Sequence, residues 1–328
     1  MLAGSGRHAL ISMSKATSET CGVCGSDMAS PPEWSDIGFN FSTRNTDSEL
    51  TVMCNGKRFV LRLVAEEFEL DGFTVEDLWD CLLFWELLSL DKTRQSTLDD
   101  FFSPETFVYT LRAVSDNLVP EKCENLNQES MFGVLLPDEL CAPWTSFKPS
   151  EIQVCEEKVI GSPNQTPRKV LKDDIGAFLK LMHRGDKQFL KTELDTYNKI
   201  DKARLDSTTR VSRLHGLVRN DSGAILGLLL TYVDCKNLTL SCAVKPKTTT
   251  ALRKKWAAQL RDMVTQLHNS GIVWGDAKPD NVLIDVNQDA WIVDFGGGYT
   301  EGWVPKTLAG TVEGDMVALE KMIDFIST

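Results

Sequence analysis

The sequence lacks any apolar run long enough to cross a membrane as a helix. Its most apolar stretch, Leu226 to Val233, is far shorter than the about 20 residues that a membrane span needs. It also lacks the apolar segment that marks a secretory signal. We therefore expect a protein that does not engage membranes and works inside the cell, in the cytoplasm, with the nucleus left open.

Basic residues are also scarce. The chain has 35 Lys and Arg against 47 Asp and Glu, which gives a formal net charge of −12. A protein that binds the phosphate backbone of nucleic acids is usually basic, so nucleic acid is not an expected partner. The same charge disfavours unaided binding to anionic membranes.

The cysteine count excludes a simple disulfide framework, because nine is an odd number and no secretory signal is visible. Cys21 and Cys24 form a single Cys-x-x-Cys pair, and the next cysteine is Cys54. Zinc usually takes four ligands, so this pair indicates either incidental thiols or half of a structural metal site. Residues 1–33 are rich in Ser, Gly, Thr and Pro and are expected to be a disordered tail.

The next part of the chain predicts a small mixed unit. Residues 49–64 alternate apolar and polar side chains around Asn55-Gly56, which is typical of a β-hairpin. Residues 74–90 have helical spacing, and residues 115–148 are polar and loop-like. We interpret residues 34–148 as an N-terminal accessory α+β region through which a protein partner could bind.

Residues 271–298 contain the side chains most suggestive of chemistry. Asp276, Asn281 and Asp294 follow one another at fixed intervals, and Lys278 lies two residues after Asp276. Phosphoryl transfer needs one carboxylate to orient the attacking hydroxyl, and a second carboxylate with an amide oxygen to hold Mg²⁺ against the phosphates. A lysine can neutralise the transferring group. A plain hairpin with acidic turns fits the same residues, and the two interpretations are compatible.

This segment resembles the catalytic loop and Asp-Phe-Gly segment of the protein kinase superfamily. Asp276 precedes Lys278 by two positions and Asn281 by five, and Asn281 precedes Asp294 by thirteen, which are the family's intervals. The resemblance implies ATP and Mg²⁺ as cofactors. Asp276 and Lys278 would be catalytic, and Asn281 and Asp294 would hold the metal. The composition of the segment is also similar to that of kinase-like proteins of filamentous fungi.

The sequence that precedes this segment also fits the resemblance. Residues 251–269 have a helical apolar face, with Thr248 to Thr250 as candidate caps and His268 as a helix-end or packing residue. Residues 224–234 resemble the last strand of the small lobe and the hinge. On that alignment Leu230 lies behind the adenine pocket, and the backbone of Thr231 and Val233 would bind adenine. A plain core strand predicts the same sequence.

The strand of residues 176–180 resembles the one that carries the phosphate-binding lysine, and residues 187–200 resemble the helix that follows it. Lys180 would then bind the phosphates and Glu193 would pair with it. Lys172, Lys187 and Lys191 compete for this role, but only Lys180 follows an apolar strand. The helix is expected to bury one face, made of Phe189, Leu190, Leu194 and Tyr197.

Three features depart from the family pattern. The phosphate-covering loop, residues 159–170, has one glycine and two prolines, which predicts a weaker grip on nucleotide. Trp274 and Gly275 replace the usual His-Arg, so activation through a phosphate captured by that arginine is not expected. The large lobe looks shortened: a last helix is predicted from Gly314-Asp315, and Asp315 is either a helix-start residue or the one that binds the catalytic-loop backbone.

The sequence thus predicts an α+β protein with a two-lobed protein kinase-like fold and a truncated helical lobe, preceded by the small α+β region. Residues 149–328 would form the kinase-like domain, with a small lobe at 149–233 and a large lobe at 234–328. The expected function is ATP- and Mg²⁺-dependent phosphoryl transfer to a Ser or Thr hydroxyl of a protein. The alternatives are a pseudokinase scaffold that binds nucleotide without efficient transfer, and a kinase acting on small-molecule hydroxyls.

Overall fold

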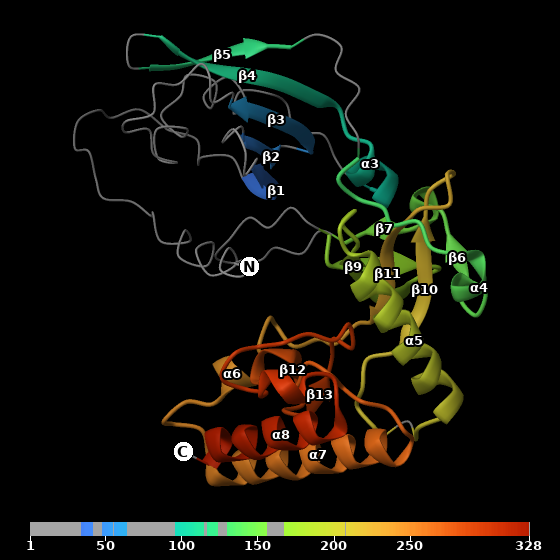
Figure 1. Cartoon of the computed structure of the whole chain (residues 1–328), viewed down its shortest axis with the longest axis vertical. Coiled ribbons are helices and arrows are strands. Elements are labelled where there is room, and N and C mark those ends of the chain that lie inside the picture. The colour runs from blue at the N-terminus through green and yellow to red at the C-terminus, as the bar shows by residue number, and fades with distance from the viewer. Residues whose placement is uncertain are drawn as a thin grey trace. The chain divides into compact units, whose positions relative to one another are not determined.

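The computed structural model describes residues 34–41, 48–54, 56–63, 96–114, 117–123, 130–155, 167–206 and 208–327. The chain divides into two compact units (Figure 1). The first comprises Met1–Arg94, Pro104–Leu126 and Glu156–Thr166, and the second comprises Gln95–Ser103, Asn127–Cys155 and Pro167–Thr328. The expected tail, the Cys21/Cys24 pair, the helix at 74–90 and most of the phosphate-covering loop lie outside the described residues.

The first unit contains a five-stranded sheet in the order β1-β2-β3-β4-β5. Its strands are β1 (Trp34–Phe41), β2 (Ser48–Cys54), β3 (Lys57–Leu63), β4 (Thr106–Val114) and β5 (Asn117–Lys122). The hairpin predicted at 49–64 is confirmed, since β2 and β3 pair antiparallel and Gly56 adopts a φ of 76° in the turn. Positive φ suits glycine because it has no Cβ. The β3–β4 pair is parallel, so it requires the long connection between these strands.

The prediction that residues 115–148 are loop-like was wrong in part. They include β5, the short helix α4 (Asp138–Cys141) and the short strand β6 (Ser146–Phe147). The sequence pattern did not predict β5, because this segment is polar and contains Pro120. Pro120 pairs with Leu111 of β4, and β5 is the last strand in the sheet order, a position where a missing backbone donor is tolerated.

The second unit begins earlier in the chain than the boundary expected at residue 149. Its first helix is α3 (Leu98–Phe102), whose Phe101 and Phe102 rings both contact the ring of Phe132. Val134 and Ile225 exchange backbone hydrogen bonds of 3.0 and 2.9 Å. These aromatic and backbone contacts attach segments before residue 149 to the core of the second unit, and composition alone did not reveal them.

A six-stranded sheet in the order β6-β10-β11-β9-β8-β7 forms the upper part of this unit. After β6 come the 3-10 turn η3 (Pro149–Glu151) and the strands β7 (Gln153–Val154), β8 (Lys169–Lys172), β9 (Ile175–Leu181), β10 (Leu214–Arg219) and β11 (Ile225–Thr231). The strand expected at residues 224–234 is confirmed as β11. Six of its seven residues are buried, which explains its continuous apolar run.

Helix α5 (Lys187–Ala203) follows β9, as predicted. Its buried positions include Leu190, Glu193, Leu194, Tyr197 and Ile200, which recur at three- and four-residue intervals. Phe189, expected on this face, is instead 50% exposed. Each helical residue is rotated by about 100° from the previous one, so Phe189 turns away from the face that Leu190 occupies.

The lower part contains a hairpin and helices. The elements are α6 (Leu240–Ala243), α7 (Thr250–Asn269), the 3-10 turn η4 (Pro279–Asn281), β12 (Val282–Ile284), β13 (Ala290–Ile292), the 3-10 turn η5 (Lys306–Leu308) and α8 (Val312–Ser327). The capped start of α7 is confirmed, because the Thr249 side chain accepts a hydrogen bond from the Leu252 amide. Helix α8 begins two residues before Gly314, and its Met316 is 41% exposed.

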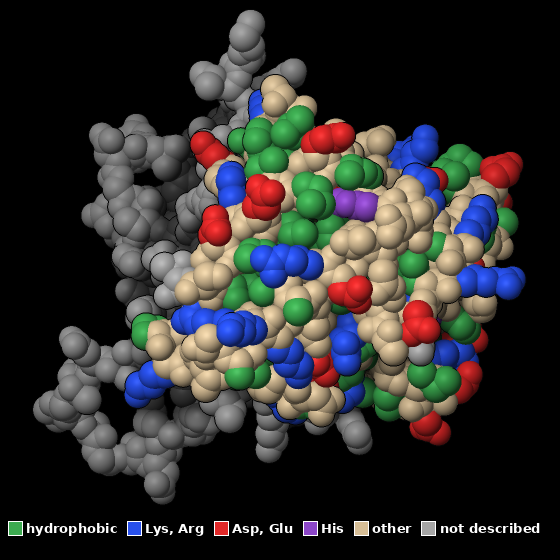
Figure 2. All heavy atoms as spheres, turned by 90° about the horizontal axis from the view of Figure 1, so that it is seen from below, with side chains coloured by type: hydrophobic (Ala, Val, Ile, Leu, Met, Phe, Trp, Pro, Cys, Tyr) green, Lys and Arg blue, Asp and Glu red, His purple; other side chains and the backbone are tan. Residues whose placement is uncertain are grey.

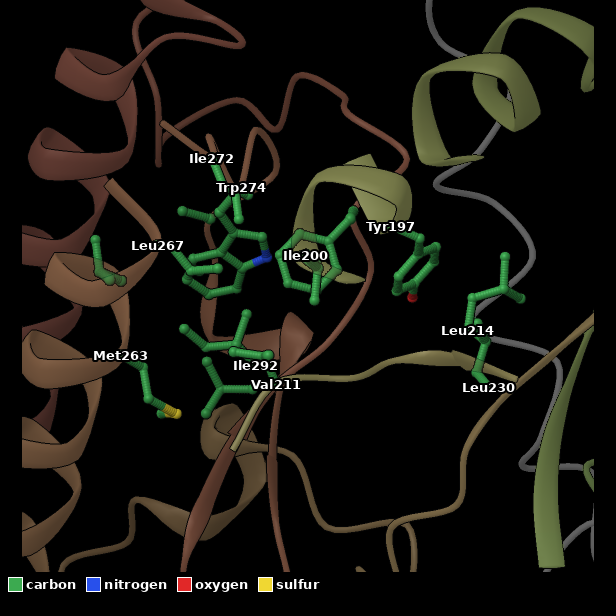
Figure 3. Close-up of a cluster of buried hydrophobic side chains, with 14 of the residues drawn as sticks. Tyr197, Ile200, Val211, Leu214, Leu230, Met263, Leu267, Ile272, Trp274 and Ile292 are labelled. Atoms are coloured by element: carbon green, nitrogen blue, oxygen red, sulfur yellow. The ribbon is translucent and has the colours of Figure 1, made fainter. Parts of the chain in front are cut away.

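The two long helices α7 and α8 lie side by side beneath the β12–β13 hairpin (Figure 1). Figure 3 shows the hydrophobic core that joins them to α5, in which Trp274 lies near Leu267, Ile272 and Ile292. Trp274 is only 1% exposed. The core therefore fixes the segment just before Asp276 against rigid elements on both sides.

Among the described helices, none combines the length and the hydrophobicity that crossing a membrane would require. Figure 2 views the molecule from below, and on the described part of that face acidic side chains lie among basic and hydrophobic ones.

Candidate functional site

Lys180 links three elements of the second unit. It lies in β9, opposite Leu228 of β11, and its Nζ is 2.8 Å from Glu193 Oε2 of α5. The same Nζ is 2.8 Å from Asp294 Oδ1, just after β13. The competing Lys172 instead contacts its neighbour Asp173 at 2.8 Å. The structure therefore brings together Lys180, Glu193 and Asp294, three residues that the sequence assigned to one site.

Burial controls the charges of this group. It raises the pKa of the Glu193 carboxyl, and the neighbouring Lys180 ammonium limits the rise. For Lys180, burial acts to lower the pKa, but the carboxylates of Glu193 and Asp294 outweigh it and the pKa is raised. Lys180 thus stays charged at neutral pH and can serve as a fixed cation for phosphate.

A second group surrounds Asp276, in the loop between α7 and η4. Asp276 Oδ2 accepts hydrogen bonds from Lys278 Nζ at 2.7 Å and from Asn281 Nδ2 at 2.9 Å. Asp276 Oδ1 accepts a hydrogen bond from the Thr300 hydroxyl at 3.2 Å. Asp276 and Asn281 are 8% and 7% exposed, so the loop holds their orientation firmly. The short spacing between residues 276 and 281 thus produces a compact polar cluster.

The hairpin connects the two groups. The Val293 amide donates a hydrogen bond to the Asn281 carbonyl at 3.1 Å. Asp294 is the next residue along the chain, so this backbone contact holds it near Asn281. Asp294 has a φ of 64°, a left-handed conformation that aspartate tolerates better than most residues. The next residue, Phe295, is buried against Tyr197 of α5, with ring centroids 5.6 Å apart. This turn directs the Asp294 carboxylate to Lys180 while Phe295 packs into the core.

Glycines let the following segment run close to both groups. A Cβ on Gly296 would lie 3.5 Å from Glu193 Oε2 and 3.6 Å from Asp294 Oδ1. A Cβ on Gly298 would lie 3.3 Å from Asp276 Cγ, which is closer than ordinary packing allows without a shift. Residues 296–298 therefore pass directly along the site.

Asp315 fixes the backbone of the loop from below. Its Oδ2 accepts a hydrogen bond from the Trp274 amide at 2.7 Å, and its Oδ1 accepts one from the Gly275 amide at 2.9 Å. His268 Nε2 also lies 3.0 Å from Oδ2. The backbone-binding role considered for Asp315 is confirmed, and His268 is the helix-end residue that was expected. The Trp274 indole donates to the Val293 carbonyl at 3.0 Å, which ties the loop to the hairpin.

The proposed adenine-contacting residues lie at the end of β11. Leu230 is 5% exposed and belongs to the core. The Thr231 amide already donates to the Arg213 carbonyl at 2.9 Å, and the Val233 carbonyl accepts from the Cys235 amide at 2.8 Å. The Thr231 carbonyl and the Val233 amide are therefore the groups of these two residues that remain candidates for adenine contact.

The donor set fits Mg²⁺, which prefers oxygen ligands and often binds through one or two protein groups plus substrate phosphates. Asn281 Nδ2 donates to the backbone carbonyl and to Oδ2 of Asp276, so the amide oxygen is the atom left for a cation. The Asp294 side chain is 40% exposed. No cluster of three or more His, Cys, Asp or Glu in the described ranges could hold a metal, so a cation here would also need nucleotide oxygens.

Sequence reasoning missed Thr300, whose hydroxyl also accepts a hydrogen bond from Lys278 Nζ at 3.0 Å. Thr300 lies more than twenty residues beyond Lys278 and belongs to no regular element, so no periodicity could link the two. The close approach of Gly298 to Asp276 was not predicted, for the same reason.

A sheet strand bearing a paired lysine, a helix bearing its glutamate, and a hairpin flanked by Asn281 and Asp294 define an α+β protein of the kinase-like class. In agreement, residues 180–311 match the family described as "Protein kinase domain". This stretch of the chain is thus similar to a protein kinase domain, in agreement with the residues that the site brings together.

Several curated proteins resemble shorter stretches of the chain. Serine/threonine-protein kinase PKH1 of Saccharomyces cerevisiae is 34% identical over 92 residues, which are 28% of this chain and 10% of that protein. Serine/threonine-protein kinase OXI1 of Arabidopsis thaliana is 32% identical over 84 residues, 25% of this chain and 20% of that protein. CBL-interacting protein kinase 21 of rice is 29% identical over 118 residues, 36% of this chain and 22% of that protein. The chain thus spans only a minor part of the length of these relatives.

Proposed function

We propose that the second unit transfers the γ-phosphoryl group of ATP to a Ser or Thr hydroxyl of a protein, in the cytoplasm or another compartment inside the cell. The observation that supports this proposal most directly is the set of hydrogen bonds that the Asp276 carboxylate accepts. Its carboxylate is oriented by Lys278 and Asn281 through Oδ2, while Oδ1 faces a hydroxyl. A carboxylate in this arrangement can accept the proton of an attacking hydroxyl. The kinase-like proteins of filamentous fungi remain the predicted narrower group.

The other residues have complementary roles in this proposal. Lys180, held by Glu193, would bind nucleotide phosphates as a fixed cation, and Lys278 would neutralise charge on the transferring group. Asn281 and Asp294 would hold Mg²⁺, which when bound would neutralise phosphate charge. The Thr231 carbonyl and the Val233 amide would contact adenine. Residues 34–148 remain a candidate region for binding a protein partner.

The test is transfer of label from radioactive ATP to a peptide array and to a metabolite mixture. We expect transfer to peptides, and a fall of about 10²–10⁴-fold in the Asp276→Asn variant, because an amide cannot take up the hydroxyl proton. Asp280→Asn is the matched control, since Asp280 lies nearby in η4 and its carboxylate accepts a hydrogen bond from Ser241 of α6 at 2.6 Å. Nucleotide binding without transfer to any acceptor would favour the pseudokinase scaffold. Transfer confined to metabolites would favour a small-molecule kinase.

The metal assignment has its own test in the Asp294→Asn variant. We expect Mg²⁺ to strengthen ATP binding to the unaltered protein and to do so much less in the variant, since an amide is a weaker ligand for a hard cation. Asp294 also contacts Lys180, so the comparison is made between affinities measured with and without Mg²⁺ for each protein. Calorimetric titration gives both values. An equal gain from Mg²⁺ in the two proteins would contradict the assignment of Asp294 as a ligand.

A further inference from the structure

A cluster of aromatic rings lies beside the start of α5. The ring of Phe132 contacts the rings of Phe101 and Phe102 of α3, with centroids 5.8 and 5.5 Å apart. It also contacts the ring of His183, with centroids 5.0 Å apart. Phe132 is only 3% exposed. His183 belongs to the connector, residues 182–186, which leads from β9 to α5, so the rings tie α3 to the connector.

Backbone hydrogen bonds also hold the connector, and their partners lie in a segment that we call the strap, residues 130–134. The Gly133 amide donates to the Met182 carbonyl at 2.9 Å, and the Arg184 amide donates to the Met131 carbonyl at 3.1 Å. Gly133 adopts a φ of 116°, a conformation that residues with a Cβ rarely adopt. The strap therefore follows a defined path along the connector.

The connector separates the two partners of the ion pair between Lys180 and Glu193. Lys180 lies in β9 just before the connector, and Glu193 lies on the buried face of α5 just after it. Within the connector, the Asp186 carboxylate accepts a hydrogen bond from the His183 amide at 3.0 Å, at the residue that precedes α5. A shift of the connector would therefore change the 2.8 Å distance between Lys180 Nζ and Glu193 Oε2.

Helix α3 is itself fixed within the second unit. The Leu98 amide donates to the Ile152 carbonyl at 2.9 Å, and the Val154 amide donates to the Ser96 carbonyl at 2.9 Å. Leu98 and Ile152 are both fully buried. Helix α3 also lies in the connection between β3 and β4, so the chain links the ring cluster directly to the sheet of the first unit.

We propose that Phe132 is a positioning residue for the phosphoryl transfer. Packed between α3 and His183, it holds the connector in place and so keeps Lys180 paired with Glu193. The inference rests on the proposed function, in which Lys180 binds the nucleotide phosphates. A displacement of about 1 Å in a positioned group can cost about a hundredfold in rate, so a small movement of the connector is enough.

A double-variant cycle on the affinity for Mg-ATP tests this role. Calorimetric titration is carried out on the full chain and on the variants Phe132→Ala, Glu193→Gln and Phe132→Ala/Glu193→Gln. We expect Phe132→Ala to weaken Mg-ATP binding by about 2- to 100-fold, the range of couplings between positions that act together. In the Glu193→Gln background the same change should have little further effect, because the charged pair that it positions is already lost. A residue that only supported the fold would weaken binding equally in both backgrounds.

Two control variants separate positioning from general damage. Phe132→Leu keeps an apolar side chain of similar size and should recover most of the affinity. Phe325→Ala removes a ring elsewhere in the second unit, in α8, where it contacts Trp303 with centroids 6.2 Å apart. It should leave Mg-ATP affinity unchanged. Thermal unfolding confirms that each variant is folded at the temperature of the titration. If Phe132→Ala does not fold, Phe102→Ala takes its place in the cycle, since it removes one ring of the cluster and leaves the strap intact.

The outcomes distinguish this inference from the proposed function. Equal weakening by Phe132→Ala in both backgrounds, or no weakening at all, would overturn the positioning role and leave the proposed function standing. The expected coupling together with no phosphoryl transfer to any acceptor would support the positioning role and overturn the proposed transfer. Absence of Mg-ATP binding to the unaltered chain would overturn both.

Discussion

Replacing Asp315 by alanine is expected to lower the free energy of unfolding of the second unit by about 2–6 kcal/mol. Asp315 is 2% exposed, and its carboxylate accepts hydrogen bonds from the amides of Trp274 and Gly275. Alanine would leave two buried backbone donors without their acceptor, and each costs about 1–3 kcal/mol. Unfolding in denaturant, followed by tryptophan fluorescence, measures the loss.

The same variant should lose phosphoryl transfer even where it remains folded, because the backbone that carries Asp276 would no longer be held. The free energy of unfolding of Asp315→Asn should lie between those of the unaltered protein and Asp315→Ala, since its amide keeps one acceptor oxygen. Glu320→Ala is the matched control, an exposed acidic residue on the same helix α8. Equal unfolding midpoints for Asp315→Ala and Glu320→Ala would show that the carboxylate does not support the loop.

Lys180→Met should affect both stability and nucleotide binding. It removes the cation from Glu193, whose side chain is 2% exposed, and leaves a buried carboxylate without a partner. Breaking a buried pair in this way costs about 3–5 kcal/mol, and we expect the lower end because the Lys180 side chain is itself 29% exposed. The affinity for Mg-ATP, measured by calorimetric titration, should fall sharply because the proposed phosphate ligand is gone.

The stability loss in Lys180→Met should depend on pH. Burial already raises the pKa of Glu193, and removing the ammonium that limits this rise would raise the pKa further. A carboxyl whose pKa is higher in the folded than in the unfolded state loses its favourable contribution as pH rises through the folded value. The free energies of unfolding of the Lys180→Met variant and of the unaltered protein should therefore differ less at pH 5 than at pH 8.

Two further variants separate charge burial from general damage to α5. Lys199→Met removes an exposed lysine that pairs with Asp195 at 2.7 Å, and should cost less than about 1 kcal/mol. The double variant Lys180→Met/Glu193→Met removes both charges and should recover much of the stability without recovering nucleotide binding. A Lys180→Met variant no less stable than Lys199→Met would contradict the coupling between Lys180 and Glu193.

The parts of the fold that followed from sequence were those with local signals. The hairpin around Gly56, the helix capped by Thr249 and the strand of Leu230 each carry their pattern within a few residues. Lys180 was selected over Lys172 because only Lys180 follows an apolar strand, and the structure places it 2.8 Å from both expected carboxylates.

Other features depend on contacts between distant residues, which no local pattern records. Thr300 reaches Asp276 through a loop whose path is set by close packing at Gly298 and by the anchor at Lys321. The strand β5 is polar because it lies at the edge of its sheet. Phe189 is apolar yet exposed, so apolar character alone did not identify the buried face of α5.

The interleaving of the two units has a consequence for proteolysis. The chain passes from one unit to the other at residues 94/95, 103/104, 126/127, 155/156 and 166/167. A protease that cut the connection between Arg94 and Gln95 would not free an intact unit, because β4 and β5 would stay with the larger fragment. Noncovalent contacts, among them the parallel pairing of β3 with β4, would then hold the strands β1, β2 and β3. Nicked protein should therefore migrate as one species in native conditions and as two fragments after denaturation.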